Sequence, residues 1–412
     1  MHQQEIIPHL FRTEYRKIVS VLCKYFGFEQ IEIAEDIASD TFLTAAQSWG
    51  LSGAPENPTA WLYHVAKNKA KNYQQRNDLF EKKIIPALKT DSNNSFENEI
   101  DLSIENINDS QLQMMFAICH PAISPEAQIG LSLRILCGFG IGEIADAFLS
   151  NKETINKRLT RAKEKLRENK IKIELPGPFE IDERLAIVLT TIYLLFSEGY
   201  YSSSQNTPIR KELCEEAMRL CTILIENNST NKPEVNALLA LMCFHASRFD
   251  ARQNEDGELI LYQEQDETLW NYELISKGIY YLKQASQGNK LSKYHLEASI
   301  AYWHTIKADT KEKWENILQL YNRLLQIGYS PVAALNRTYA LAKANGKLVA
   351  IREAEKLNLT SDPFYFALLG ELYTDIDNSK AKLNFQQALK LAKTQADKRA
   401  MEKKIAGLNL KF

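Results

Sequence analysis

The sequence is poor in cysteine, proline and glycine, and it contains no recognisable metal-binding motif. Among its 412 residues are 6 cysteines, 12 prolines and 16 glycines. The cysteines lie far apart in the chain, at Cys23, Cys119, Cys137, Cys214, Cys221 and Cys243. No CxxC pair and no Cys/His cluster has zinc-ligand spacing, so we expect no metal site. An unpaired cysteine behaves as a small hydrophobe, and we therefore predict free, buried thiols.

Long apolar runs and a large net charge are also missing. A membrane helix requires about 20 consecutive apolar residues, and no stretch approaches that length. The N-terminal sequence MHQQEIIPHLFRTEYRK has no uninterrupted apolar segment of the kind found in signal peptides. We therefore expect a soluble, cytoplasmic protein with no membrane partner. The formal net charge is -2, so any binding to nucleic acid must depend on local basic surfaces.

Helical periodicity runs through almost the whole chain and predicts an all-α fold. A first helical domain spans about 8–78, and a flexible linker rich in Asn, Ser and acidic residues covers 79–109. A second helical domain follows at 110–172, and the sequence LPGPFE at 175–180 marks a boundary. The remaining segment, 180–412, forms a C-terminal helical extension. Within it, Pro331 and Pro363 open two similar segments, which predict tetratricopeptide-like helix pairs over 330–406.

The strongest local signal is the sequence IGEIADAFLSNKETINKRLTRAKEKLR at 141–167. Its first part offers Ile144 and Ala145 to a core, and the small Ala145 allows a second helix to cross closely. Asn151 is a good N-cap for the next helix, and Glu153 adds negative charge to its first turn. This order of helix, short turn and capped helix predicts a helix-turn-helix.

The second helix of this motif separates an apolar face from a basic face. Its predicted core positions recur at helical spacing: Ile155, Leu159, Ala162 and Leu166. From 152 to 167 it carries seven Lys/Arg and two Glu, a balance of +5. Such a face suits the major groove of DNA and the flanking phosphates, although a solvated basic helix is the plainer alternative.

Another basic helix is predicted upstream, in WLYHVAKNKAKNYQQR at 61–76, with Pro58 near its start. Leu62, Ala66, Ala70 and Tyr73 form the inner stripe. The segment has a charge of +4 and no acidic residue. Lysines and amides near aromatic rings suit unpaired bases as well as duplex phosphates, and an ordinary surface helix has the same pattern about as often.

An acidic amphipathic helix is predicted at 31–49, IEIAEDIASDTFLTAAQSW. Ile37, Thr41 and Ala45 are expected to face inward. The opposite edge is expected to be acidic and partly apolar, with Glu35, Asp36, Ser39, Asp40 and Phe42. Such an edge suits a partner helix, although a solvated face is an equally good interpretation.

Together, these segments resemble the extracytoplasmic-function (ECF) branch of the bacterial RNA polymerase sigma factors. The resemblance covers about 8–170 and rests on the order EDIASDTF, WLYHVAKNKAKNY, a variable linker, and SPEAQIGLSLRILCGFGIGEIADAF with its basic helix. The first domain then corresponds to sigma region 2 and the second to sigma region 4. Residues 180–412 resemble the subgroup with a long C-terminal helical-repeat extension.

The resemblance implies three sets of contacts, with the RNA polymerase core and promoter DNA as partners. The beta-prime clamp helices would bind Glu35, Asp36, Asp40 and Phe42, and the beta flap is a further expected partner within the core. The minus-10 element would contact the loop Ser52–Thr59 and His64, Lys67, Asn68, Lys71 and Asn72. The minus-35 element would contact Thr154, Asn156, Lys157, Arg158 and Arg161. His64 stands where arginine is commoner in that signature.

No group of polar residues in the extension has the spacing of a metal site, a catalytic triad or a phosphate-binding loop. The candidates are Glu198, His245, Arg248, Asp250, Arg252, Asp256, Gln265, Asp266, His295 and His304. We interpret them as hydrogen-bonding groups between packed helices, and we expect no enzyme activity and no cofactor. The extension is expected to regulate transcription by binding a protein partner or ligand. Two alternatives stay open: a polymerase-independent helix-turn-helix regulator with a sensory repeat domain, and a repeat scaffold for other proteins.

Overall fold

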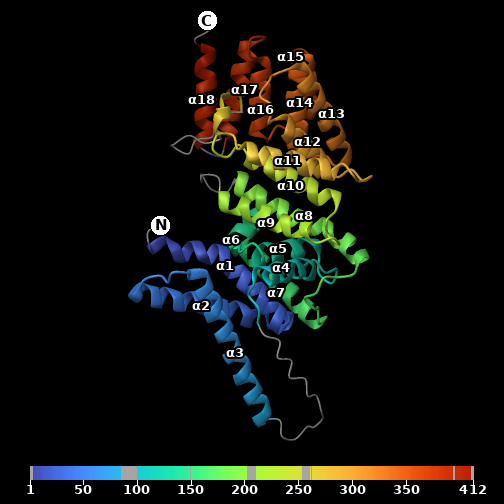
Figure 1. Ribbon diagram of the computed structural model, residues 1–412. Coiled ribbons are helices and arrows are strands. Elements are labelled where there is room, and N and C mark those ends of the chain that lie inside the picture. The colour runs from blue at the N-terminus through green and yellow to red at the C-terminus, as the bar shows by residue number, and fades with distance from the viewer. Residues whose placement is uncertain are drawn as a thin grey trace. The chain divides into compact units, whose positions relative to one another are not determined.

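The computed structural model describes residues 3–84, 100–148, 150–201, 210–252, 260, 262–392 and 395–409. These residues form eighteen α-helices and three 3-10 helices, and none of them lies in a strand. The predicted all-α fold, with a helical-repeat extension after two small helical domains, is confirmed. Figure 1 shows the helices in chain order, from α1 in blue to α18 in red.

The chain divides into two compact units. The first contains 1–195 together with 226–230, and the second contains 196–225 together with 231–412. Helix α8 (Pro178–Tyr201) begins in the first unit and ends in the second.

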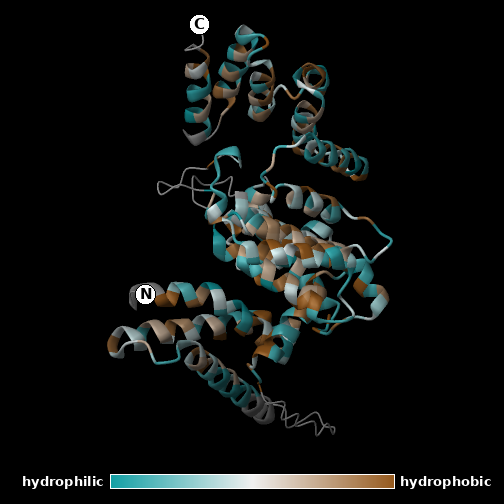
Figure 2. Cartoon of the chain, turned by 45° about the horizontal axis from the view of Figure 1, so that its top comes forward, coloured by the Kyte–Doolittle hydropathy of each residue, from teal (hydrophilic) through white to brown (hydrophobic). Residues whose placement is uncertain are grey.

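Three long helices form the N-terminal part of the first unit. They are α1 (Gln3–Phe26), α2 (Ile31–Ser52) and α3 (Pro58–Ile84). Gly27 has a φ of 86° and ends α1, because glycine adopts this left-handed conformation without strain. Phe28, 1% exposed, follows it into the core. The C-terminal part of α3 extends beyond α1 and α2 in Figures 1 and 2.

Four shorter helices complete most of the first unit. They are α4 (Ile104–Ile118), α5 (Pro125–Ile135), α6 (Ile141–Ala147) and α7 (Lys152–Glu168). The side chains of Ser103 and Ser124 cap α4 and α5, since each accepts a hydrogen bond from a backbone N–H of the first turn. Helix α4 thus begins inside the segment predicted as linker, and Ile100 before it is already buried. The part of that linker from 85 to 99 lies outside the described residues.

The second unit is a succession of paired helices. After α8 it contains α9 (Lys211–Glu226), α10 (Pro233–Ala246), α11 (Tyr272–Ala285), α12 (Lys293–Trp303), α13 (Lys311–Ile327), α14 (Pro331–Asn345), α15 (Lys347–Leu357), α16 (Pro363–Tyr373), α17 (Asn378–Leu391) and α18 (Gln395–Asn409). Hydrophobic and hydrophilic residues are mixed along most of these helices in Figure 2, as expected for helices that pack one face against their neighbours, whereas α10 is buried over most of its length.

The two segments predicted as helix pairs are hairpins that begin at Pro331 and Pro363. Proline is the first residue of α14 and of α16, where its missing N–H costs no helical hydrogen bond. In the second hairpin Gly370 lies against the ring of Phe385, and a Cβ at this position would come within 2.6 Å of the ring. The close approach of α16 and α17 therefore depends on this glycine.

All six cysteines are free and buried, as the sequence predicts. Burial raises the pKa of the Cys119, Cys214 and Cys243 thiols to about 12. Within the described ranges, no helix is both long and apolar enough to cross a membrane.

Candidate nucleic-acid interface

Helix α7 is held in place by its cap and its apolar face. The Asn151 side chain accepts a hydrogen bond of 2.8 Å from the backbone N–H of Thr154, which confirms the predicted N-cap. The four predicted core positions of this helix are all buried: Ile155, Leu159, Ala162 and Leu166. The Leu159 side chain lies so close to α5 that a Cβ on Gly130 would come within 3.0 Å of it. The sequence thus fixes which side of α7 faces solvent.

The exposed side of α7 carries most of the residues predicted to contact the minus-35 element. Thr154, Asn156, Lys157 and Arg161 are exposed. Arg158 is half-buried, and its guanidinium carbon lies 5.6 Å from the centroid of the Phe148 ring. Stacking of this kind restricts the side chain but leaves its N–H donors available.

One flank of α7 forms ion pairs with α2. Lys163 Nζ lies 3.0 Å from Glu35 Oε2, and Arg167 Nη2 lies 2.5 Å from Glu32 Oε2. We refer to these two ion pairs as the α2–α7 contact. Nothing local in either helix predicts this contact, because its partners are more than 100 residues apart in the chain. Thr154, Lys157 and Arg161 project from another part of the helix surface and stay exposed.

Helix α3 presents the residues predicted to contact the minus-10 element. Its inner stripe is as predicted: Leu62, Ala66 and Ala70 are fully buried, and Tyr73 packs edge-on against Phe26 with 5.7 Å between ring centroids. Residues on the other side are exposed or partly so: His64, Asn68, Lys71 and Asn72 are exposed, and Lys67 is half-buried.

Two interactions order the polar side of α3. The Asn68 amide nitrogen lies 2.9 Å from His64 Nε2. The two residues are one helical turn apart, and their side chains form a hydrogen-bonded pair on the surface of α3. Lys69 Nζ lies 2.5 Å from Asp40 Oδ2 on α2. This ion pair orients Asp40 toward α3, while Lys71 and Asn72 lie on the exposed side. In Figure 2 the described part of α3 is predominantly hydrophilic.

Helix α2 carries the residues predicted to bind the polymerase, and these residues differ in their exposure to solvent. Asp36 and Asp40 are exposed, while Glu35 is half-buried and paired with Lys163. Phe42 was expected on the exposed edge of the helix, and the structure shows otherwise. It is 5% exposed, and its ring packs edge-on against Phe11 with 5.1 Å between centroids. Phe42 lies at the margin of the apolar face, and α1 covers that margin.

The exposed sides of α3 and α7 suit contacts with an anionic polymer. The outward sides of α3 and α7 combine lysine, arginine and amide groups, which donate hydrogen bonds to phosphates and base edges. In the part of the chain that the structure describes, no three Cys, His, Asp or Glu side chains are grouped so that they could hold a metal ion.

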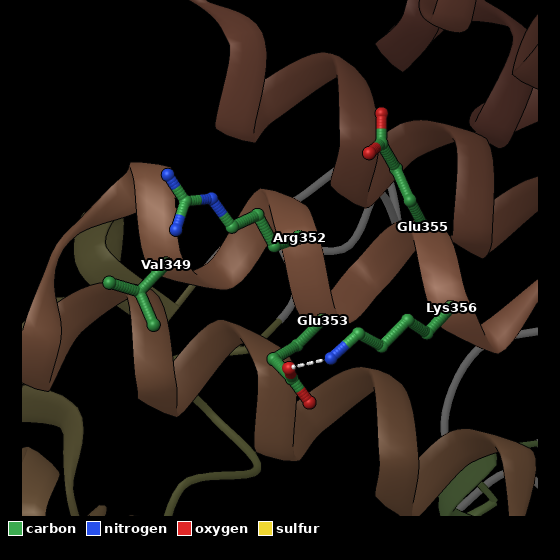
Figure 3. Close-up of a pocket in the computed structure, with 5 residues that line it drawn as sticks. All are labelled: Val349, Arg352, Glu353, Glu355 and Lys356. Atoms are coloured by element: carbon green, nitrogen blue, oxygen red, sulfur yellow. Dashed lines mark hydrogen bonds and ion pairs between the residues drawn. The ribbon is translucent and has the colours of Figure 1, made fainter.

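A hollow on α15 has a volume of about 690 Å³ but offers no comparable site. All five lining residues come from this single helix: Val349, Arg352, Glu353, Glu355 and Lys356 (Figure 3). Glu353 pairs with Lys356 at 2.6 Å, and Glu355 accepts a hydrogen bond of 2.6 Å from Tyr373. Two carboxylates of this surface thus already have partners.

Comparisons with known proteins find two family matches in the chain. Residues 10–79 match the family Sigma-70 region 2, and residues 184–286 match a family of unknown function, DUF6596. The chain is 30% identical over 383 residues to Uncharacterized protein R00370 of Rhizobium meliloti (strain 1021), covering 91% of this chain and 89% of that protein. No solved structure matches. The chain therefore belongs to the same family as the Rhizobium protein, and the match of 10–79 to region 2 supports a sigma factor of the sigma-70 family.

Proposed function

We propose that this protein is an alternative sigma factor of the ECF type, which directs the RNA polymerase core to specific promoters. The observation that carries the proposal is the match of 10–79 to sigma-70 region 2, followed in the same unit by a capped basic helix behind a short turn. The polymerase core would supply nucleotidyl transfer. The sigma subunit would supply promoter choice and strand opening, and it would need no catalytic site or cofactor of its own.

Helix α7 would read the minus-35 element in the major groove. Thr154 and Asn156 lie in its first turns and could reach base edges, whereas Lys157 and Arg161 could bind phosphates on either side. Arg158 is positioned by Phe148, which favours a fixed donor geometry.

Helix α3 and the loop Ser52–Thr59 before it would open and hold the minus-10 element. The His64–Asn68 pair offers hydrogen-bonding groups to an unpaired base, and Lys71 and Asn72 lie one turn further along the same exposed side. Single-stranded bases expose edges that a duplex hides, so amide groups can recognise them.

The exposed carboxylates of α2 would bind the beta-prime clamp helices. Asp36 is exposed, Asp40 is exposed but paired with Lys69, and Glu35 is half-buried and paired with Lys163. A polymerase surface that binds Glu35 would therefore compete with Lys163 of α7 for this carboxylate. Binding of the core would then release the flank of α7 and let the two DNA readers separate.

The second unit would control this activity, in place of or beside a separate anti-sigma factor. Stacked helix pairs provide a broad surface for a regulatory partner. A chain ended after Tyr201 tests this role while keeping α8, whose Arg184 donates a hydrogen bond of 3.1 Å to the Phe116 carbonyl. We expect truncation to change the transcript level, and equal transcription by both chains would contradict the regulatory role.

Run-off transcription with purified polymerase core tests the main proposal. The template would carry the promoter regions of the protein's own gene and its neighbours. We expect a transcript that requires this protein and fades in Asn68→Ala and Arg161→Ala, while Lys277→Ala, an exposed lysine on α11, behaves as wild type. If no transcript forms and no polymerase co-purifies, a polymerase-independent regulator becomes the better interpretation.

A further inference from the structure

A cluster of aromatic and cationic side chains surrounds Arg248 in the second unit. The segment that includes Tyr262 and Trp270 folds back against the end of α10, where the backbone N–H of Asn271 donates a hydrogen bond of 2.7 Å to the Ser247 carbonyl. The Tyr262 hydroxyl donates to the Ile306 carbonyl at 3.1 Å. The region after α12 thus contributes to the same cluster.

Arg248 is a buried cation without a counter-ion. Its side chain is 7% exposed, and its guanidinium carbon lies 5.4 Å from the centroid of the Tyr262 ring. Its Nε is buried and has no hydrogen-bond acceptor. Across the described ranges, no carboxylate forms an ion pair with it. Because burying an unpaired charge is costly, such a group calls for a missing anion.

Two lysines add to the positive charge at the same ring. Lys313 is 1% exposed, and its Nζ lies 5.1 Å from the Tyr262 centroid and 3.0 Å from the Tyr262 hydroxyl oxygen. Lys307 Nζ lies 5.9 Å from the centroids of both Tyr262 and Trp270. Three cations therefore converge on one aromatic ring.

The neighbouring carboxylate, Asp309, accepts hydrogen bonds from side chains other than Arg248, Lys307 and Lys313. Asp309 accepts hydrogen bonds from Trp314 and from Lys343, the latter at 2.7 Å. The cluster is positive enough to affect His304, whose pKa falls to about 3 through burial and the charges of Arg248 and Lys313. His304 is accordingly neutral at physiological pH and cannot compete as a further cation.

Two further polar atoms in the cluster lack partners. They are Gln265 Oε1, on a side chain that is 6% exposed, and Trp270 Nε1, on a side chain that is 4% exposed. Together with Arg248 Nε they provide two donors and one acceptor without hydrogen bonds. An anion that also carries a hydroxyl or another donor has the complementary groups for atoms of this kind.

We propose that the cluster of Arg248, Lys307 and Lys313 beside Tyr262 and Trp270 is a binding site for a small anion that carries a phosphate or carboxylate group. The planar guanidinium suits bidentate binding of either group, and the two lysines supply additional charge. All residues of the site lie in the second unit. A failed test of the site would therefore leave the proposed promoter recognition untouched, and the reverse also holds. It would make the extension a sensor of a small anionic metabolite.

Thermal unfolding of the full-length protein tests the site. Inorganic phosphate and malonate serve as the two probes, each compared with sodium chloride at equal ionic strength. Because a ligand bound only by the folded state stabilises it, we expect the Tm to rise by about 5 °C at a concentration near 100-fold above Kd. A rise with phosphate alone identifies a phosphate ligand, and a rise with malonate identifies a carboxylate ligand. No rise with either anion overturns the proposal.

Arg248→Gln separates ligand binding from a purely structural role. The variant should lose the anion-dependent rise in Tm, and in chloride its Tm should equal or exceed that of the wild type, because an unpaired buried charge is gone. If the anion-dependent rise persists, the proposal is wrong. Lys307→Gln, on a half-buried residue, provides the same test should Arg248→Gln fail to fold. Lys277→Gln removes an exposed cation elsewhere in this unit and should respond as the wild type.

Discussion

Replacing Lys157 and Arg161 together should weaken promoter binding and reduce its dependence on salt. Both side chains are exposed on α7, about one helical turn apart. Lys157 pairs only with Glu153, at 2.7 Å, and the two side chains are 64% and 78% exposed. An exposed ion pair contributes at most about 1 kcal/mol, so Lys157 can exchange Glu153 for a phosphate at little cost.

The size of the effect follows from counter-ion release. Each phosphate contact contributes about 0.9 to the slope of log affinity against log salt concentration. The variant Lys157→Ala/Arg161→Ala should therefore have a slope smaller by about 1.8. Between about 50 and 200 mM salt, its affinity should fall about tenfold less than that of the wild type.

Fluorescence anisotropy of a labelled promoter duplex, titrated with reconstituted holoenzyme at several salt concentrations, measures this slope. Lys277→Ala is the matched control, because Lys277 is also exposed and pairs with Glu273 one turn earlier, at 2.8 Å, but lies on α11. Equal slopes for the double variant, the control and the wild type would refute the assignment of α7 as the recognition helix.

Three further predictions test the first and second units separately. Asn151→Ala removes the cap of α7 and should lower the free energy of unfolding by about 1 kcal/mol in urea titrations. Gly370→Ala should destabilise the second unit by about 1–3 kcal/mol, because its Cβ would meet the Phe385 ring, whereas an unchanged Tm would refute the close helix approach. A short bis-maleimide linking Glu35→Cys to Lys163→Cys should abolish transcription, whereas the same variant before linking should keep measurable transcription, lowered only by the lost contact of Glu35 with the polymerase. The native thiols are buried and should not react.

The sequence predicted correctly those features of α7 that depend on residues close together in the chain. The cap at Asn151 and the buried stripe through Leu159 depend on residues within a few turns, so the sequence was sufficient to find both. Phe42 was misplaced because its environment depends on α1. A residue at the margin of the apolar face can either be exposed to solvent or pack against a neighbouring helix. The rings of Phe11 and Tyr15 on α1 pack against Phe42 and bury it.

The features that sequence reasoning could not find depend on contacts between distant segments. Polar groups of the extension were interpreted as hydrogen-bonding partners between helices, and His295 fits that view, since its ring nitrogens contact Ser292 and the Ala285 carbonyl. Asp256 lies outside the described residues. Arg248 departs from the interpretation, because only the folded chain reveals that its Nε has no acceptor.

In the proposed function, the α2–α7 contact would connect polymerase binding with DNA recognition through the carboxylate of Glu35. Glu35 is half-buried beside Lys163, so their attraction is screened less than that of a fully exposed pair. Glu32 and Arg167 are more exposed and contribute less. A contact of this modest strength can hold the free protein in a compact state and still be exchanged for polymerase and promoter contacts. Because the exposed side of α7 remains available throughout, the first encounter with DNA does not require the contact to open. If α3 and α7 bind the minus-10 and minus-35 elements as proposed, full engagement of both would require the contact to open, and the polymerase surface that binds Glu35 would supply the compensating interaction.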